Sequence, residues 1–413
     1  MSLVGTVATI SGFVLMSKFI SVFLGAASLL VFSQSRDIIR LSQQIISLNG
    51  TVSIVQYLSS YKKRENTKKI MGALSVYSTK ISLVLVSVIL LLSALHYVNW
   101  YLGIGTSLFI LFYRRFYMRH VYLLVLGKVR NFYGIQVISL FSAICVSVLL
   151  YIIGFVSEHL LIGSFWFTYG VFWLIFSVRC DAPDLEKSPL NELFNSKLFS
   201  VARDSIVMLI LGLLTILIFR YGVSLKTSTE YAGYFDAGWS ISVFYMSFIF
   251  NALMSVLLPE FASSVTLSSS EVRRPLQFVI AAAIIGSMLL LVFSDIIVGV
   301  LFSDKFVVSM GLVRAMAPTE ILRSVSWYFG VVLLSKGYTK QLLMASLIYN
   351  IGLLVSINFV EVLANFKLAY GMINLIYLFF VLYFIDKHVL SIRNYGKELI
   401  LIAIAYIVTW FLT

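Results

Sequence analysis

Long apolar runs, each close to the length that crosses a bilayer, follow one another along almost the whole chain. A spanning helix needs about 20 mostly apolar residues, because each residue advances it by about 1.5 Å through a hydrocarbon layer of about 30 Å. The pattern predicts twelve spans, at 3–32, 38–60, 72–95, 101–126, 132–154, 162–180, 203–223, 234–258, 276–301, 309–335, 340–360 and 366–385. A thirteenth stretch, Glu398 to Thr413, is short for a crossing and could span, lie in the interface or pack on the bundle.

The longest polar interruption, residues 181–202, contains two of the five prolines and separates the sixth span from the seventh. It predicts an N-terminal lobe at 1–180, a cytoplasmic linker, a C-terminal lobe at 203–385 and an extension at 386–413. The inner connections LGKVRNFYGIQVIS and LSKGYTKQLLMASL, after spans four and ten, form a weak internal repeat that agrees with two parallel halves. The expected fold is therefore all-α and membrane-embedded, with two six-helix lobes.

The composition also indicates a membrane protein. Hydrophobic residues make up 60% of the chain and charged residues only 12%, whereas about 25% of residues in soluble domains are charged. The first apolar run has no basic region ahead of it and is longer than a signal-peptide core, so it is expected to be a retained span.

The net charge of +13 need not indicate nucleic acid, because the positive-inside rule accounts for most of it. With the N-terminus in the cytoplasm, 17 of the 31 Lys and Arg residues fall in inner connections. Only four fall in outer ones: Arg36, Lys226, Lys305 and Lys367. The asymmetry predicts a cytoplasmic N-terminus.

The fourth span carries three arginines, Arg114, Arg115 and Arg119, near its middle. A cation at a helix centre costs about 2.5 to 3.5 kcal/mol on insertion, and Arg114 is about 18 Å from either end, which is far for a side chain to reach the interface. Arg115 and Arg119 are four apart and share one face. These arginines therefore either line a wet cavity that receives an anionic ligand or pair with an acid on another helix.

Other polar side chains within spans offer fewer clues. Lys18 and Arg314 are further candidates for anion binding, although Arg314 is near enough to the outer face to reach it. Glu320 and Arg323, three apart, either neutralise each other or let Glu320 take up a proton during a transport cycle. The role of Asp236 is equally open. Three further residues are expected at interfaces: Lys80, Arg220 and Asp295.

Aromatic residues make up 15% of the chain. Candidates for stacking on a sugar are Trp239, Trp327, Tyr328 and Tyr349, with Asn350 as a hydrogen-bonding neighbour. The alternative for each is a place at the bilayer interface or in the core.

Several chemistries find no support in the sequence. The two cysteines and four histidines are scattered and form no metal or acid-base set, so neither a metal site nor a cofactor is predicted. The chain has no GxxxxGK motif followed by Ser or Thr, which makes ATP hydrolysis within it unexpected. The longest outer connection is only about ten residues, too short for the catalytic loop of a membrane-embedded polymerase or glycosyltransferase.

A series of segments resembles the Wzx-type flippases of lipid-linked oligosaccharides, including those for O-antigen and enterobacterial common antigen, within the multidrug, oligosaccharidyl-lipid and polysaccharide exporter superfamily. The resemblance covers about residues 1–385. Besides Lys18 and the Glu320–Arg323 spacing followed by YFGVVLLSKG, it rests on IVQYLSSYKKREN, LGKVRN, EYAGYFDAGWSIS, LLPEFAS and LFSDKF, in that order along the chain. The turn expected after the first span is replaced by VFSQSRD.

The resemblance implies a monomeric transporter of the bacterial inner membrane, not an enzyme, whose central cavity opens alternately to the two sides. The implied cargo is a polyprenyl (undecaprenyl) pyrophosphate carrying a short glycan, moved among membrane lipids and alongside a polymerase and glycosyltransferases. Two negative charges moving outward at 100 mV gain about 4 to 5 kcal/mol, so uniport and ion antiport both stay open. The main alternative is a multidrug exporter of the same superfamily, although an arginine-rich cavity would repel organic cations.

Overall fold

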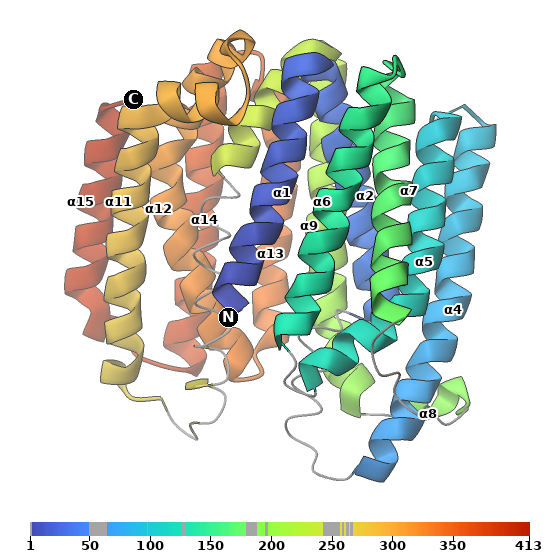
Figure 1. The fold of residues 1–413 in the computed structure, drawn as a ribbon. Coiled ribbons are helices and arrows are strands. Elements are labelled where there is room, and N and C mark those ends of the chain that lie inside the picture. The colour runs from blue at the N-terminus through green and yellow to red at the C-terminus, as the bar shows by residue number, and fades with distance from the viewer. Residues whose placement is uncertain are drawn as a thin grey trace. The chain divides into compact units, whose positions relative to one another are not determined.

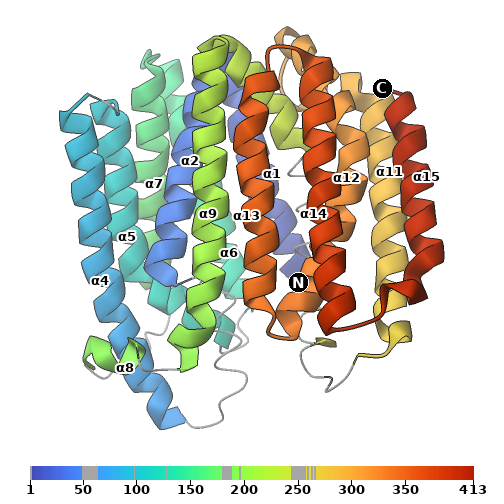
Figure 2. The ribbon, with the colours of Figure 1, turned by 180° about the vertical axis from the view of Figure 1, so that it is seen from behind.

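The computed structural model describes residues 2–48, 64–96, 98–125, 129–178, 188–194, 197–242, 257, 260–261, 264 and 267–413, and every regular element in this part of the chain is a helix. The α-helices are α1 (Ser2–Phe23), α2 (Ala26–Ser47), α4 (Arg64–Ala94), α5 (Trp100–Val125), α6 (Val129–Ile152), α7 (Glu158–Val178), α8 (Leu190–Phe194), α9 (Lys197–Lys226), α11 (Ser269–Leu301), α12 (Val307–Ser335), α13 (Thr339–Ser356), α14 (Leu363–His388) and α15 (Gly396–Phe411) (Figures 1 and 2). Residues 229–242 form a further helix, and three 3₁₀ turns connect neighbouring helices: η1 (Asp304–Phe306), η2 (Ile357–Phe359) and η3 (Ile392–Tyr395).

Seven helical segments of the described chain are long and apolar enough to cross a membrane: Met71–Ala94, Tyr133–Ile152, Glu158–Val178, Ile206–Lys226, Ser269–Leu301, Thr339–Phe359 and Leu363–His388. Large apolar side chains remain exposed along them, Ile152 and Val292 among the most exposed, as expected of surfaces that face lipid rather than water. The chain is thus an all-helical, multi-pass membrane protein. The count of twelve spans stays a prediction.

The first turn lies earlier than the sequence pattern predicts. The N–H groups of Leu24 and Gly25 both donate to the carbonyl of Ile20, at 2.8 and 3.0 Å, and Gly25 has a φ of +91°, the left-handed geometry in which glycine ends a helix. The prediction that Arg36 lies in an outer loop is therefore wrong. Arg36 lies inside α2 with 2% of its surface exposed, beside Asp37 with 3% exposed.

Two compact units make up the chain. Unit 1 comprises Met1–Phe19 and Val31–Leu214, and unit 2 comprises Ile20–Leu30 and Thr215–Thr413. In unit 1, α5 and α7 approach closely because a glycine of each helix lies against the backbone of the other. A Cβ on Gly105 would collide with the carbonyl of Gly163, and a Cβ on Gly163 would collide with the carbonyl of Tyr101. The lobe boundaries of the sequence analysis stay predictions.

The close contact of α5 with α7 predicts that replacing glycine with alanine has opposite effects at two positions of unit 1. Gly163→Ala is expected to destabilise the protein by about 1 to 3 kcal/mol, because the new methyl group collides with backbone that cannot rotate away. Gly134→Ala, in α6 with nothing within 4 Å of the added Cβ, should stabilise it by about 0.5 to 1 kcal/mol through its better helix propensity. Thermal unfolding of the purified variants in detergent would show this, and shifts of the same sign would contradict the contact.

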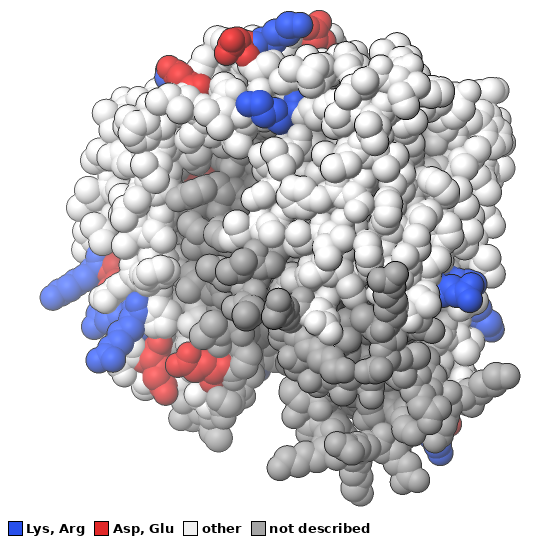
Figure 3. All heavy atoms as spheres, in the orientation of Figure 1, with Lys and Arg blue, Asp and Glu red and all other residues white. Residues whose placement is uncertain are grey.

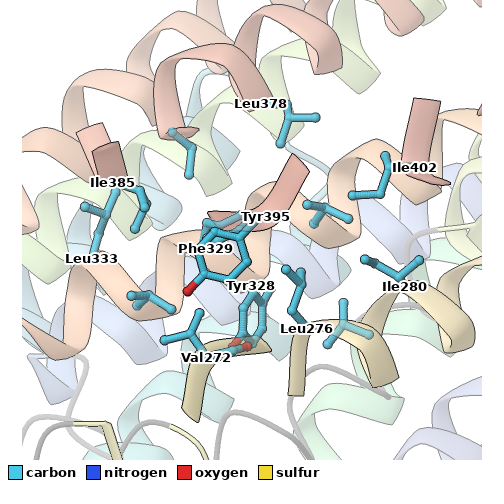
Figure 4. Packing of buried hydrophobic residues seen from close by; sticks show 14 of the residues in the cluster. Val272, Leu276, Ile280, Tyr328, Phe329, Leu333, Leu378, Ile385, Tyr395 and Ile402 are labelled. Atoms are coloured by element: carbon cyan, nitrogen blue, oxygen red, sulfur yellow. The ribbon is translucent and has the colours of Figure 1, made fainter. Parts of the chain in front are cut away.

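The core of unit 2 gathers around α12, most of whose residues are buried. Figure 4 shows Tyr328 and Phe329 of α12 packed between Val272, Leu276 and Ile280 of α11 on one side and residues of α14, η3 and α15 on the other. The Tyr328 hydroxyl donates to the carbonyl of Val272 at 2.6 Å, which satisfies the one polar atom that this ring brings into the core.

Helix α15 is attached to unit 2 at both ends. At its start, Arg273 of α11 donates to the carbonyl of Asn394 at 2.7 Å and pairs with Glu398 at 2.8 Å. At its end, the Lys367 ammonium of α14 donates to the carbonyl of Trp410 at 2.9 Å and lies 4.4 Å from the centre of the Trp410 ring. The thirteenth apolar stretch therefore packs on unit 2 as a helix, and its crossing of the membrane stays a prediction.

Candidate functional site

A carboxylate, a guanidinium and a phenol meet inside unit 2. Glu320 and Arg323 lie on α12, about 20 Å from either end of that helix, and Tyr370 lies on α14. Glu320 Oε2 is 3.1 Å from Arg323 Nη2, Arg323 Nη1 donates to the Tyr370 hydroxyl at 3.1 Å, and that hydroxyl donates to Glu320 Oε1 at 3.4 Å. Glu320 and Arg323 thus lie as an ion pair, with Tyr370 closing a three-membered ring of contacts, and the role of Glu320 stays a prediction.

The desolvation of this pair is severe. The side chain of Glu320 is 0% exposed and that of Arg323 is 17% exposed. Charges so far from water persist only when each compensates the other, since an isolated buried ion costs several kcal/mol. A neighbouring amide, Asn374, donates to the Tyr370 carbonyl at 2.8 Å, while its own Oδ1 has no hydrogen-bond donor among the described residues. The cluster therefore combines a neutralised ion pair with a buried acceptor.

A second buried pair lies nearby in unit 2. Arg220 of α9 and Asp236 of the 229–242 helix approach to 2.5 Å, with side chains 8% and 2% exposed. Trp239 follows one turn after Asp236, and its ring lies 5.5 Å from that of Tyr370. The Trp239 ring therefore lies between the two ion pairs: it is one turn from Asp236 and packs against Tyr370, which contacts Glu320 and Arg323. The expectation that Arg220 lies at an interface is wrong, because its guanidinium is buried against Asp236.

The aromatic candidates differ in accessibility. Trp239 is 4% exposed and packs among the rings of the cluster around Phe219, and Tyr328 belongs to the core of Figure 4. Trp327, Tyr349 and Asn350 are only partly buried. Of the five, these three present surface that a sugar could contact in this conformation, and stacking stays a prediction for all of them.

The cationic candidates of unit 1 lie on three helices. Lys18 of α1 and Arg114 of α5 are half-buried, and Arg115 is exposed. Arg119 follows one turn later on α5, but its side chain lies outside the described residues. To these the structure adds Arg36 of α2, which the sequence analysis missed. The sequence does contain a pattern that indicates a helix here, because Arg36 and Arg40 are one helical turn apart and share a face with Gln43 and Gln44.

Arg314 belongs to unit 2 and has a partner. Its Nη2 is 2.5 Å from Asp295 of α11, and its Nε donates to Ser294 at 2.8 Å. Both charged side chains are about half exposed, next to a break in helical geometry at Phe293. Asp295 already compensates the charge of Arg314, which makes Arg314 a weaker candidate for binding an anion than the arginines of α5.

The fold matches solved structures of membrane transporters. A lipid II flippase, MurJ, in an inward closed conformation, has a TM-score of 0.60 at 13% identity, over 98% of this chain and 96% of that one. The MATE multidrug transporter DinF-BH has a TM-score of 0.57 at 15% identity, over 94% of this chain and 93% of that one. No protein-family model matches the sequence, and no curated protein matches it either. The chain therefore has the fold shared by a lipid flippase and a drug exporter, over almost its full length.

Proposed function

We propose that this protein is a transporter of the Wzx type, which moves polyprenyl-pyrophosphate-linked oligosaccharides from the cytoplasmic to the outer leaflet of a bacterial inner membrane by alternating access. The observation that carries the proposal is the charge of three helices whose charged residues all belong to unit 1. Helices α1, α2 and α5 together contain one acid, Asp37, against six cations: Lys18, Arg36, Arg40, Arg114, Arg115 and Arg119.

Clustered positive charge within apolar helices makes their surroundings favourable for an anion. A pyrophosphate supplies that anion, because it presents two charged groups of oxygen acceptors that match the fork of an arginine guanidinium. The polyprenyl chain would stay in the hydrocarbon layer while the diphosphate and glycan cross within the protein. An inside-negative membrane potential favours this direction by about 2.3 kcal/mol per charge at 100 mV.

The two matched folds suggest two classes of cargo, a lipid and a drug. A flippase of lipid II is, by its name, a carrier of a lipid, which agrees with a lipid-linked cargo here. The multidrug exporter is the second candidate, because its fold matches nearly as well. The six cations named above argue against organic cations as cargo, and two of the buried acids, Glu320 and Asp236, already hold arginine partners.

The test is a deletion strain that carries either an empty vector or the wild-type chain. Without the protein, we expect lipid-linked repeat units to accumulate on the inner leaflet and surface glycan to be lost, and the wild-type chain should restore both. Normal glycan in the strain with the empty vector would exclude this function. Efflux of a cationic dye, measured in the same strains, would instead support the drug exporter if it depended on the protein.

A further inference from the structure

A groove runs along the surface of unit 2 between α11 and α15, which lie side by side in both ribbon views (Figures 1 and 2). Its volume is about 550 Å³, within the usual range for sites that bind small molecules. Its walls are mainly apolar, with Ile280 and Ile284 on α11 and Leu401 on α15. Gln277, Lys397 and Glu398 form its polar end. A site with one apolar and one polar end suits an amphipathic ligand.

The residues named at the polar end are cationic on balance, with four cations, Arg273, Arg274, Arg393 and Lys397, against three acids, Glu271, Asp386 and Glu398. Glu398 pairs with Arg273 at 2.8 Å and accepts from Gln277 at 3.1 Å. Glu271 accepts from the backbone N–H of Ser268, and Asp386 from that of Ile392. Three exposed cations, which form no ion pair with any described residue, remain at this end of the unit: Arg274, Arg393 and Lys397. Helices α11 and α15 also both begin here, and helix N-termini favour anions.

The surroundings of the groove are those of a lipid-facing surface. Ile285 beside it is 60% exposed, and Ile400 and Ile404 of α15 are 62% and 54% exposed. In Figure 3 the surface over α11 and α15 carries charged side chains near its lower end and an uncharged stretch directly above them. A ligand in the groove is therefore flanked by hydrocarbon along most of its length and by cations at one level.

We propose that the α11–α15 groove binds an anionic phospholipid of the surrounding bilayer, with one acyl chain along Ile280, Ile284 and Leu401 and its phosphate against Lys397 and Arg274. The charge at the polar end selects this occupant. A zwitterionic phospholipid of the same chain length would gain the apolar contact but little electrostatic attraction. This site is separate from the proposed transport function, and its test measures binding rather than transport.

Native mass spectrometry of the delipidated full-length protein in detergent would test the site, with phosphatidylglycerol and phosphatidylcholine of identical chains as probes. Phosphatidylglycerol should bind more tightly, and Arg274→Gln with Lys397→Gln should weaken it roughly fivefold for each cation removed. Lys305→Gln, an exposed lysine of η1, is the charge-matched control and should leave binding unchanged.

Separate variants test the apolar walls of the α11–α15 groove. Ala281→Trp places a bulky side chain in the groove wall and should abolish the tightly bound lipid, whereas Ile400→Trp, on α15 but outside the groove wall, should not. Thermal unfolding would verify that each variant is folded. Equal affinity for the two lipids, or unchanged phosphatidylglycerol binding by a folded Ala281→Trp variant, would overturn the proposal. A change in oligomeric mass without a change in lipid binding would identify the groove as an interface between copies instead, which would also overturn it.

Discussion

Neutralising both Arg114 and Arg115 to glutamine is expected to reduce transport of the lipid-linked glycan by about a hundredfold or more. Each guanidinium can form charge-assisted hydrogen bonds to a diphosphate, worth about 1.5 to 3 kcal/mol apiece. Folding should be spared, because Arg115 is exposed and Arg114 is only half-buried in α5. Surface glycan and inner-leaflet repeat units, measured in the complemented deletion strain at matched protein abundance, would give the result.

Lys80→Gln is the matched control for this experiment. Lys80 is also a cation within an apolar helix of unit 1, but it is exposed on α4 and is not among the three helices that carry the excess charge. Its replacement should leave transport within about twofold of wild type, as is usual for surface substitutions. Full transport by the double arginine variant would show that these arginines serve the structure rather than the cargo.

Replacing Glu320 with leucine is expected to lower the stability of the protein by about 3 to 5 kcal/mol, because Arg323 then has no carboxylate partner in a site that is largely closed to water. Replacing both residues with leucine should recover most of that loss, since an apolar pair of similar volume removes the desolvation cost of both charges. Thermal unfolding and the abundance of membrane-inserted protein would measure the series. Glu361→Gln, at an exposed acid between η2 and α14, should change stability by less than about 0.5 kcal/mol.

The double variant also separates the two roles left open for Glu320. If the pair is structural, the protein with two leucines should fold and retain transport. If it folds but no longer transports, the pair takes part in the cycle, for instance through a proton that Glu320 accepts when Arg323 moves away from it. A double variant as unstable as the single one would contradict the compensation argument itself.

Hydropathy alone predicted most helix positions well, because an apolar helix in a membrane is defined by its own length and composition. The predicted span at 132–154 corresponds to α6 and the one at 309–335 to α12, within a few residues at each end. The failure came at α2, where Ser33 to Asp37 form five polar residues in a row. Hydropathy interprets such a run as a loop, whereas Gly25 supplies the actual turn and tertiary partners such as Trp166, which donates to Ser35 at 2.9 Å, accommodate the polar side chains.

The candidate site was predictable only in part. Glu320 and Arg323 are three apart on one helix, so their proximity is predictable from the sequence, which leaves open whether they neutralise each other. The pairing of Arg220 with Asp236 joins two different helices, and the contact of Tyr370 with Arg323 spans 47 residues. Contacts of this kind depend on how helices pack against one another. No local pattern in a single sequence predicts that packing.

The attachment of α15 also has a consequence for the order of events during synthesis. Arg273 is made 125 residues before its partner Glu398, which at 5 to 20 residues per second is a wait of roughly 6 to 25 s. During that interval Arg273 lacks its Glu398 partner, and the faces of α11 and α12 that α15 later covers remain open to lipid. The packing of unit 2 is therefore completed only when α15 has been made, near the end of this sequence, so a chain halted after α14 should be less stable than the whole one.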